Sequence, residues 1–114
     1  CAAGLATLEV FREQRLFERA AERAPYWQEA LHSLRDARHV IDIRNLGLIG
    51  GVELEPRPGK PTQRALETFR ACFEKGVLIR VTGDIIALSP PLVINKAQID
   101  RIVETIRDVL QQLE

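Results

Sequence analysis

Apolar residues at helical spacing dominate the first third of the chain. They predict an amphipathic helix over residues 2–13, a polar break at 13–15 and a second helical stretch over 16–34. Pro25 lies inside that second stretch. Because proline lacks an N–H and clashes with the preceding turn, we expect it to kink the helix or to start a new one. Trp27, the single tryptophan, is interpreted as an anchor in the core or at a domain interface.

The pattern then changes from helical spacing to alternation. Residues 39–44 are rich in β-branched side chains and predict a strand. A turn over 45–47 and a returning strand over 48–54 complete an antiparallel hairpin or a bulged pair. Gly50 and Gly51 would weaken the interior of that strand unless another element needs to approach its backbone closely there.

The second half of the chain repeats the order of a helix followed by paired strands. Pro61 suits the first turn of a helix, and Gly76 suits its C-terminal cap. Asn95 and Gln98 resemble a capping box, which begins the last helix of the chain. The remaining segments are predicted as a loop over 56–61, strands over 77–81 and 85–88 with a turn over 82–84 between them, and an irregular exit over 89–92.

This element order predicts an α+β fold, in which helices cover an antiparallel sheet of three or four strands. A doubly wound parallel sheet fits less well, because the strands come in closely spaced pairs, too close for the crossover connections that parallel strands need.

Composition narrows the class of protein. The 114 residues suit one domain, and 16 basic against 16 acidic side chains argue against nucleic-acid binding. No apolar run approaches the ~20 residues of a membrane helix. Two cysteines without a disulfide framework fit a reducing, cytoplasmic setting. The chain opens at Cys1 inside a helical pattern without a methionine, so we interpret it as a piece of a longer protein.

Few residues carry obvious chemistry. His32 and His39 lack partners at zinc-ligand spacing, and no glycine-rich phosphate loop precedes a helix. Cys72 lies on the apolar face of its predicted helix, which favours a buried, inert thiol over a nucleophile. The lysines, all at predicted loops or helix ends, do not suit Schiff-base chemistry: Lys60, Lys75 and Lys96.

Arg80 interrupts an apolar strand beside a tight turn. A guanidinium suits bidentate recognition of a carboxylate, so one interpretation is a ligand contact. The residues themselves favour a solvated charge at a sheet edge, or an ion pair with Asp84. Arg44, which also ends a predicted strand, is open to the same alternatives.

Several segments together resemble a known enzyme family. They read VIDIRNLGL at 40–48, GVLIR at 76–80 and SPPL at 89–92, and residues 1–6 resemble the start of the helix that follows a catalytic core. In this order they are similar to the C-terminal part of class III pyridoxal-phosphate aminotransferases, and closest to the omega-amino acid–pyruvate (β-alanine–pyruvate) branch. The similarity covers essentially the whole chain.

The resemblance implies that residues 1–114 are the small C-terminal domain of a fold-type I enzyme. In such enzymes pyridoxal 5'-phosphate is bound mainly by a large domain, whose lysine forms the Schiff base. This chain would then contain no catalytic, cofactor-binding or metal-binding residue, and it would be inactive alone. Its expected partners are its own large domain, a second subunit of a homodimer or tetramer, and amino acid, amine and 2-oxo acid substrates.

The resemblance also assigns a substrate-binding role. Arg80 matches the arginine that meets the substrate carboxylate in this family. The turn residues Gly83 and Asp84, with Pro90 and Pro91, would form the pocket wall beside it. Arg44 looks like a structural residue of the sheet.

Two alternatives remain at this point. The chain could be a free-standing α+β module that binds a small ligand or another protein. It could also belong to another class III transaminase, of the ornithine, GABA or diaminopelargonate type.

Overall fold

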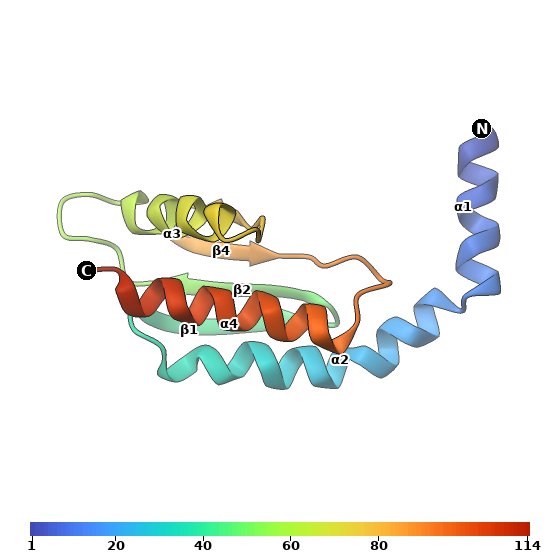
Figure 1. Cartoon of the computed structure of the whole chain (residues 1–114), viewed down its shortest axis with the longest axis horizontal. Coiled ribbons are helices and arrows are strands. Elements are labelled where there is room, and N and C mark those ends of the chain that lie inside the picture. The colour runs from blue at the N-terminus through green and yellow to red at the C-terminus, as the bar shows by residue number, and fades with distance from the viewer.

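The computed structural model describes residues 1–114 and shows four helices and four strands in the predicted order (Figure 1). The elements are α1 (Ala2–Glu13), α2 (Leu16–His32), the short 3₁₀ helix η1 (Ser33–Asp36), β1 (Val40–Leu46), β2 (Ile49–Leu54), α3 (Gln63–Glu74), β3 (Arg80–Thr82), β4 (Ile85–Leu88) and α4 (Lys96–Gln112). None of the helices combines the length and the apolar character needed to cross a membrane.

The strands form one antiparallel sheet in the order β1-β2-β4-β3. Side chains alternate between its two faces. Val52 and Ile86, which are paired across β2 and β4, are fully buried on the face that α2, α3 and α4 cover. The opposite face carries more exposed side chains, such as Ile49. The predicted α+β class is confirmed.

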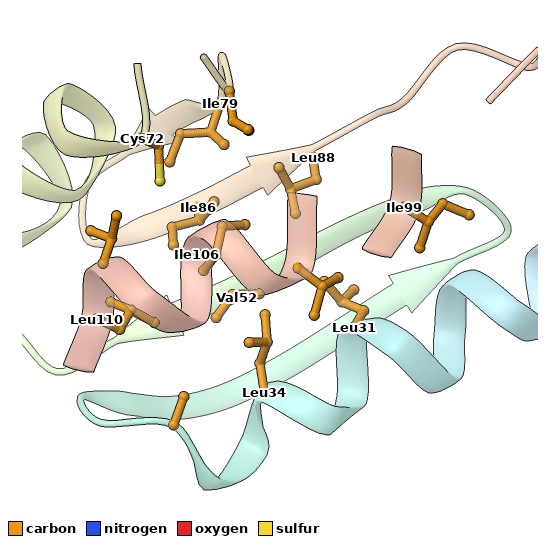
Figure 2. Close-up of a cluster of buried hydrophobic side chains, with 14 of the residues drawn as sticks. Leu31, Leu34, Val52, Cys72, Ile79, Ile86, Leu88, Ile99, Ile106 and Leu110 are labelled. Carbon is orange, nitrogen blue, oxygen red and sulfur yellow. The ribbon is translucent and has the colours of Figure 1, made fainter. Parts of the chain in front are cut away.

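The core is one cluster of 19 buried residues between the sheet and the helices (Figure 2). Figure 2 shows Ile106 and Leu110 of α4 beside Val52 and Ile86 of the sheet, with Leu34 below them. Trp27 of α2 is fully buried in this cluster, which confirms its interpretation as a core anchor.

Both predicted helix caps are confirmed. The Asn95 side chain accepts from the Gln98 N–H at 2.9 Å, and the Gln98 side chain accepts from the Asn95 N–H at 3.1 Å. At the end of α3, Gly76 has φ 87°, and its N–H and that of Val77 reach back to carbonyls of the last turn at 2.9 Å each. This is a Schellman motif, which needs the left-handed conformation that glycine adopts without steric cost.

The first hairpin differs from its prediction. Asn45 and Leu46 continue β1 instead of forming the turn, and the turn is the pair Gly47–Leu48. Gly47 has φ 58°, so it supplies the positive dihedral angle that a two-residue hairpin connection requires. Leu48 therefore lies in the turn and not in the returning strand.

The third strand is shorter than predicted. It begins at Arg80 and not at residue 77, because it pairs only with β4, where Arg80 lies opposite Ala87. The same register would place Val77 opposite Pro90. Proline has no N–H to donate, so the ladder could not have reached Val77, and it ends earlier, at Arg80 and Ala87.

The structure also shows how Pro25 and Pro61 affect the helices in which they were expected. Pro25 lies inside a continuous α2, and the helix changes direction in Figure 1 without restarting. Pro61 was expected in the first turn of α3, but α3 begins at Gln63. Thr62 between them has φ 71°, a left-handed conformation that no residue inside a helix adopts.

The glycine pair of β2 is explained by the packing of α2. A Cβ atom added at Gly50 would lie 2.5 Å from Leu31 Cδ2 and 3.4 Å from Trp27 Nε1. At Gly51 the nearest atom would be Ile85 Cγ2 at 3.7 Å, an ordinary contact. The close approach of α2 therefore requires glycine at position 50 but not at position 51.

We predict that Gly50→Ala lowers the free energy of unfolding by about 1–3 kcal/mol, because the new methyl group overpacks the contact between α2 and β2. Gly51→Ala is the matched control and should leave stability nearly unchanged. Urea unfolding of both variants measures the difference. Equal stabilities would show that the helix can move away at little cost.

Candidate functional site

A cavity of 580 Å³ lies at the end of the β3–β4 hairpin, where the hydrogen-bonded ladder stops. Most of its lining is hydrophobic, and α2, α3, α4 and the two segments flanking the hairpin all contribute to it. The lining residues are Trp27, Leu66, Phe69, Leu78, Ile79, Arg80, Val81, Ala87, Leu88, Ser89, Pro90, Pro91 and Ile102.

Arg80 is the one charged residue among those that line this cavity. It is the first residue of β3, its backbone is fixed by the pairing with Ala87, and its side chain is exposed. The side chain makes no hydrogen bond to another residue and no ion pair. The structure therefore lacks the ion pair with Asp84, whereas the alternative of a solvated charge at a sheet edge agrees with the exposure of Arg80 on edge strand β3.

Of the four residues expected to form the pocket wall, the structure brings two to Arg80. Pro90 and Pro91 line the same cavity. Gly83 and Asp84 do not, because they form the turn at the opposite end of the hairpin, where Gly83 has φ 58°.

Asp84 has a different task, which sequence reasoning did not anticipate. Its Oδ2 accepts a hydrogen bond from the N–H of Thr62 at 2.9 Å, and its Oδ1 is buried. A carboxylate at this position also interacts favourably with the N-terminal end of α3. Asp84 therefore ties the β3–β4 turn to the beginning of α3.

Arg44 differs from Arg80 in having partners on its own sheet. Its Nη1 donates to Glu53 Oε2 at 2.9 Å and to Asp42. The hydrogen bond to Glu53 and, to a smaller extent, the one to Asp42 raise the pKa of the Arg44 guanidinium above its usual value. Both carboxylates come from β1 and β2, so the expected structural role of Arg44 agrees with its contacts.

The two histidines serve structural contacts. His32 Nε2 lies 2.8 Å from Asn45 Oδ1, and His39 Nε2 lies 3.0 Å from the carbonyl oxygen of Leu113. No three side chains of the metal-binding types gather closely enough to hold a metal ion.

Sequence reasoning missed the apolar part of the cavity. Leu66, Phe69 and Ile102 lie at helical spacing in α3 and α4, and Trp27 was interpreted as an anchor in the core or at a domain interface. Their helical spacing is the signal of a buried face, and it carries no information about which buried residues border an opening. The indole N–H of Trp27 is buried without a hydrogen-bond partner beside this cavity.

Comparison with known proteins places the chain. The profile of the family described as aminotransferase class III matches residues 1–110. An omega-aminotransferase of Caulobacter vibrioides is 68% identical over 114 residues, which are 100% of this chain and 26% of that protein. A beta-alanine–pyruvate aminotransferase of Pseudomonas aeruginosa is 36% identical over 96% of this chain and 25% of its own length. The chain belongs to the class III aminotransferases.

Solved structures of aminotransferases share the fold. The adenosylmethionine-8-amino-7-oxononanoate aminotransferase of Methanocaldococcus jannaschii superposes with a TM-score of 0.88 at 29% identity, over 98% of this chain and 27% of that one. The chain thus spans about a quarter of the length of the aminotransferases it matches. Membership of an enzyme family argues against a free-standing interaction module.

The family implies pyridoxal phosphate, so the lysines of this chain matter. Lys60, Lys75 and Lys96 are all exposed, and none lines the cavity. An amine that forms a Schiff base needs a desolvated pocket, and none of these three exposed side chains lies in one. None of these three lysines therefore fits the role of the Schiff-base lysine.

We predict that Asp84→Ala lowers the free energy of unfolding by about 1 kcal/mol, because the N–H of Thr62 loses its acceptor at the start of α3. Asp84→Asn keeps an oxygen acceptor and should lose less. Urea unfolding measures both variants. A pocket-wall role would instead change activity and leave stability unaltered.

A second prediction concerns Cys72, whose side chain is fully buried in the core. Burial raises the pKa of its thiol from 9.0 to about 11, so almost no thiolate exists at pH 8. Iodoacetamide at pH 8 should therefore modify the exposed Cys1 and leave Cys72 unmodified until urea is added, as peptide mapping would show.

The same pKa shift has a consequence for stability. The folded state favours the neutral thiol. The contribution of Cys72 to the free energy of unfolding is therefore complete below pH 9.0 and is lost as the pH rises toward 11. Modification of Cys72 in the native protein at pH 8 would contradict the assignment of a buried, inert thiol.

Proposed function

We propose that residues 1–114 are the small C-terminal domain of a class III aminotransferase and that Arg80 binds the carboxylate of its substrates. The observation that carries this proposal is the unpaired guanidinium of Arg80 on a mostly apolar cavity. A guanidinium offers parallel N–H donors that match a carboxylate, and low-polarity surroundings strengthen that interaction.

The proposed reaction moves an amino group from an ω-amino acid or an amine to pyruvate or a similar 2-oxo acid. The names of the two relatives, omega-aminotransferase and beta-alanine–pyruvate aminotransferase, support this substrate class. A single binding site must then accept pyruvate, which has a carboxylate, and amines that have none. An exposed arginine without an internal partner suits this, because no residue of this domain competes with the carboxylate.

Pyridoxal phosphate, when bound, supplies the electron sink of transamination. We propose that residues outside this chain hold it, including those of a second subunit. Residues 1–114 would then orient the substrate. Arg80 fixes the carboxylate end, and the apolar lining excludes water from the rest of the molecule.

A second candidate is a transaminase of the type that acts in 8-amino-7-oxononanoate chemistry. The high TM-score of the Methanocaldococcus jannaschii enzyme favours it, because that structure carries this name. Profiling of amino donors with the full-length protein separates the candidates: activity with β-alanine or simple amines and pyruvate supports the first, and adenosylmethionine as the preferred donor supports the second.

We predict that Arg80→Ala in the full-length enzyme raises the KM for pyruvate at least about 30-fold. Loss of one partner of a buried, hydrogen-bonded charge pair costs roughly 2–5 kcal/mol, and 1.4 kcal/mol is tenfold in affinity, so this effect requires that bound substrate and pocket bury the pair. The KM for a donor amine without a carboxylate should change less than about threefold. Steady-state kinetics with each substrate varied in turn measures both constants.

Two variants serve as controls. Arg80→Lys keeps the positive charge but loses the planar fork, so it should restore part of the affinity for pyruvate. Arg44→Ala removes an arginine whose partners lie on its own sheet, so it should leave both KM values nearly unchanged. An equal loss for pyruvate and for the amine in Arg80→Ala would overturn the carboxylate role.

A further inference from the structure

Three of the residues that line the cavity carry polar side-chain atoms: Trp27, Arg80 and Ser89. The indole N–H of Trp27 is buried, so a ligand in the cavity does not reach it. Arg80 and Ser89 are both exposed. The guanidinium and the Ser89 hydroxyl are therefore the two side-chain hydrogen-bond donors that a molecule in this mostly apolar cavity meets.

The hydroxyl of Ser89 is free, unlike that of the other serine in the chain. Ser33 donates to the carbonyl oxygen of Ala30 and accepts from Arg107 at 3.1 Å, whereas the Ser89 side chain makes no hydrogen bond within residues 1–114. Ser89 is followed by Pro90, and a proline restricts the residue before it to extended backbone conformations. The backbone of Ser89 is thus held in place while its donor has no internal partner.

The register of the sheet places Ser89 beside Arg80. Arg80 lies opposite Ala87, and directly opposed side chains in an antiparallel pair have Cβ atoms about 4.5–5.5 Å apart. Ser89 follows Ala87 by two positions, so continued alternation puts it on the same face, as a diagonal neighbour roughly 7–8 Å from Arg80. Because the methyl group of Ala87 is small, the space between the guanidinium and the hydroxyl is open to a ligand.

A carboxylate accepts more hydrogen bonds than one guanidinium donates to it. Its two oxygens offer about four lone-pair sites, and bidentate pairing with an arginine occupies two of them. Apolar surroundings exclude the water that would otherwise occupy the remaining sites, and an unsatisfied charged acceptor is costly. A second donor on the cavity wall removes that cost.

We propose that Ser89 is a second substrate-binding residue, whose hydroxyl donates a hydrogen bond to the same carboxylate that the guanidinium of Arg80 binds. This inference rests on the proposed function. Ser89 then favours substrates that carry a carboxylate, because an amine without one leaves the hydroxyl without an acceptor. Contacts to Arg80 and Ser89 together fix the plane of the carboxylate, which a single arginine leaves free to pivot.

Ser89→Ala in the full-length enzyme tests this inference. The KM for pyruvate should rise at least about fivefold, because the variant loses a hydrogen bond to a charged group. The KM for a donor amine without a carboxylate should change less than about twofold. Steady-state kinetics with each substrate varied in turn measures both constants. An unchanged KM for pyruvate, or an equal rise for both substrates, would overturn the inference.

Thr82→Val is the matched control. Thr82 carries an exposed hydroxyl on the same strand as Arg80, two positions away and on the same face, but it does not line the cavity. Its loss should leave both KM values within about twofold of the unaltered enzyme. A rise in the KM for pyruvate equal to that of Ser89→Ala would show a general effect on the hairpin and would count against a specific contact at Ser89.

A double-mutant cycle tests whether the two residues bind one carboxylate. The effect of Ser89→Ala on the KM for pyruvate should differ at least about threefold between the unaltered enzyme and the Arg80→Lys variant, because contacts to a shared group are not additive. Additive effects would overturn the shared contact.

Arg80→Ala, measured beside Ser89→Ala, keeps the two proposals apart. A rise in the KM for pyruvate in Arg80→Ala alone supports the proposed function and refutes this inference. A selective rise in Ser89→Ala, together with an equal loss for both substrates in Arg80→Ala, supports the hydrogen bond from Ser89 and refutes the carboxylate role of Arg80.

Discussion

A proline cannot donate a hydrogen bond to a neighbouring strand, and this constraint shapes the end of the sheet on which the candidate site depends. The pairing of β3 with β4 ends at Arg80 and Ala87, and Pro90 and Pro91 cannot extend the ladder farther along the chain. Beyond this point the two segments of the chain are not paired, and apolar side chains of α2, α3 and α4 line the cavity there. Arg80 is the paired residue at this end of β3, so it lies at the cavity where the ladder ends.

Two arginines of the sheet differ in whether neighbouring carboxylates bind their side chains. Arg44 and Arg80 lie on the two edge strands, β1 and β3. The neighbours of Arg44 include Asp42 and Glu53, which occupy its donors. The acid nearest to Arg80 in sequence, Asp84, faces the N–H of Thr62 instead. One guanidinium is therefore committed to the fold, and the other is available to a ligand.

Much of this arrangement was predictable from local sequence signals. The capping box at Asn95, the Schellman glycine at Gly76 and the alternation of the strands each depend on a few adjacent residues, and the structure has all of them. The resemblance to aminotransferases pointed to Arg80, although spacing alone favoured a solvated or ion-paired charge.

The errors came where distant segments meet. The length of β3 depends on which residue of β4 lies opposite, and the start of α3 depends on a carboxylate 22 positions away in the sequence. The close approach of Leu31 to Gly50 could be suspected from the glycines but not assigned to a partner. The cavity itself is formed by helices that have no sequence feature in common with Arg80. No periodicity of one element contains such information.

The hydrogen bond from Thr62 to Asp84 has a mechanical consequence. It fastens the tip of the hairpin that carries Arg80 to the first residue before α3, and α3 supplies Leu66 and Phe69 to the facing wall. The strand that carries Arg80 and the apolar wall are therefore linked at a point remote from the opening. A movement of the β3–β4 hairpin relative to α3 would have to break this hydrogen bond, so the link opposes a change in the width of the cavity.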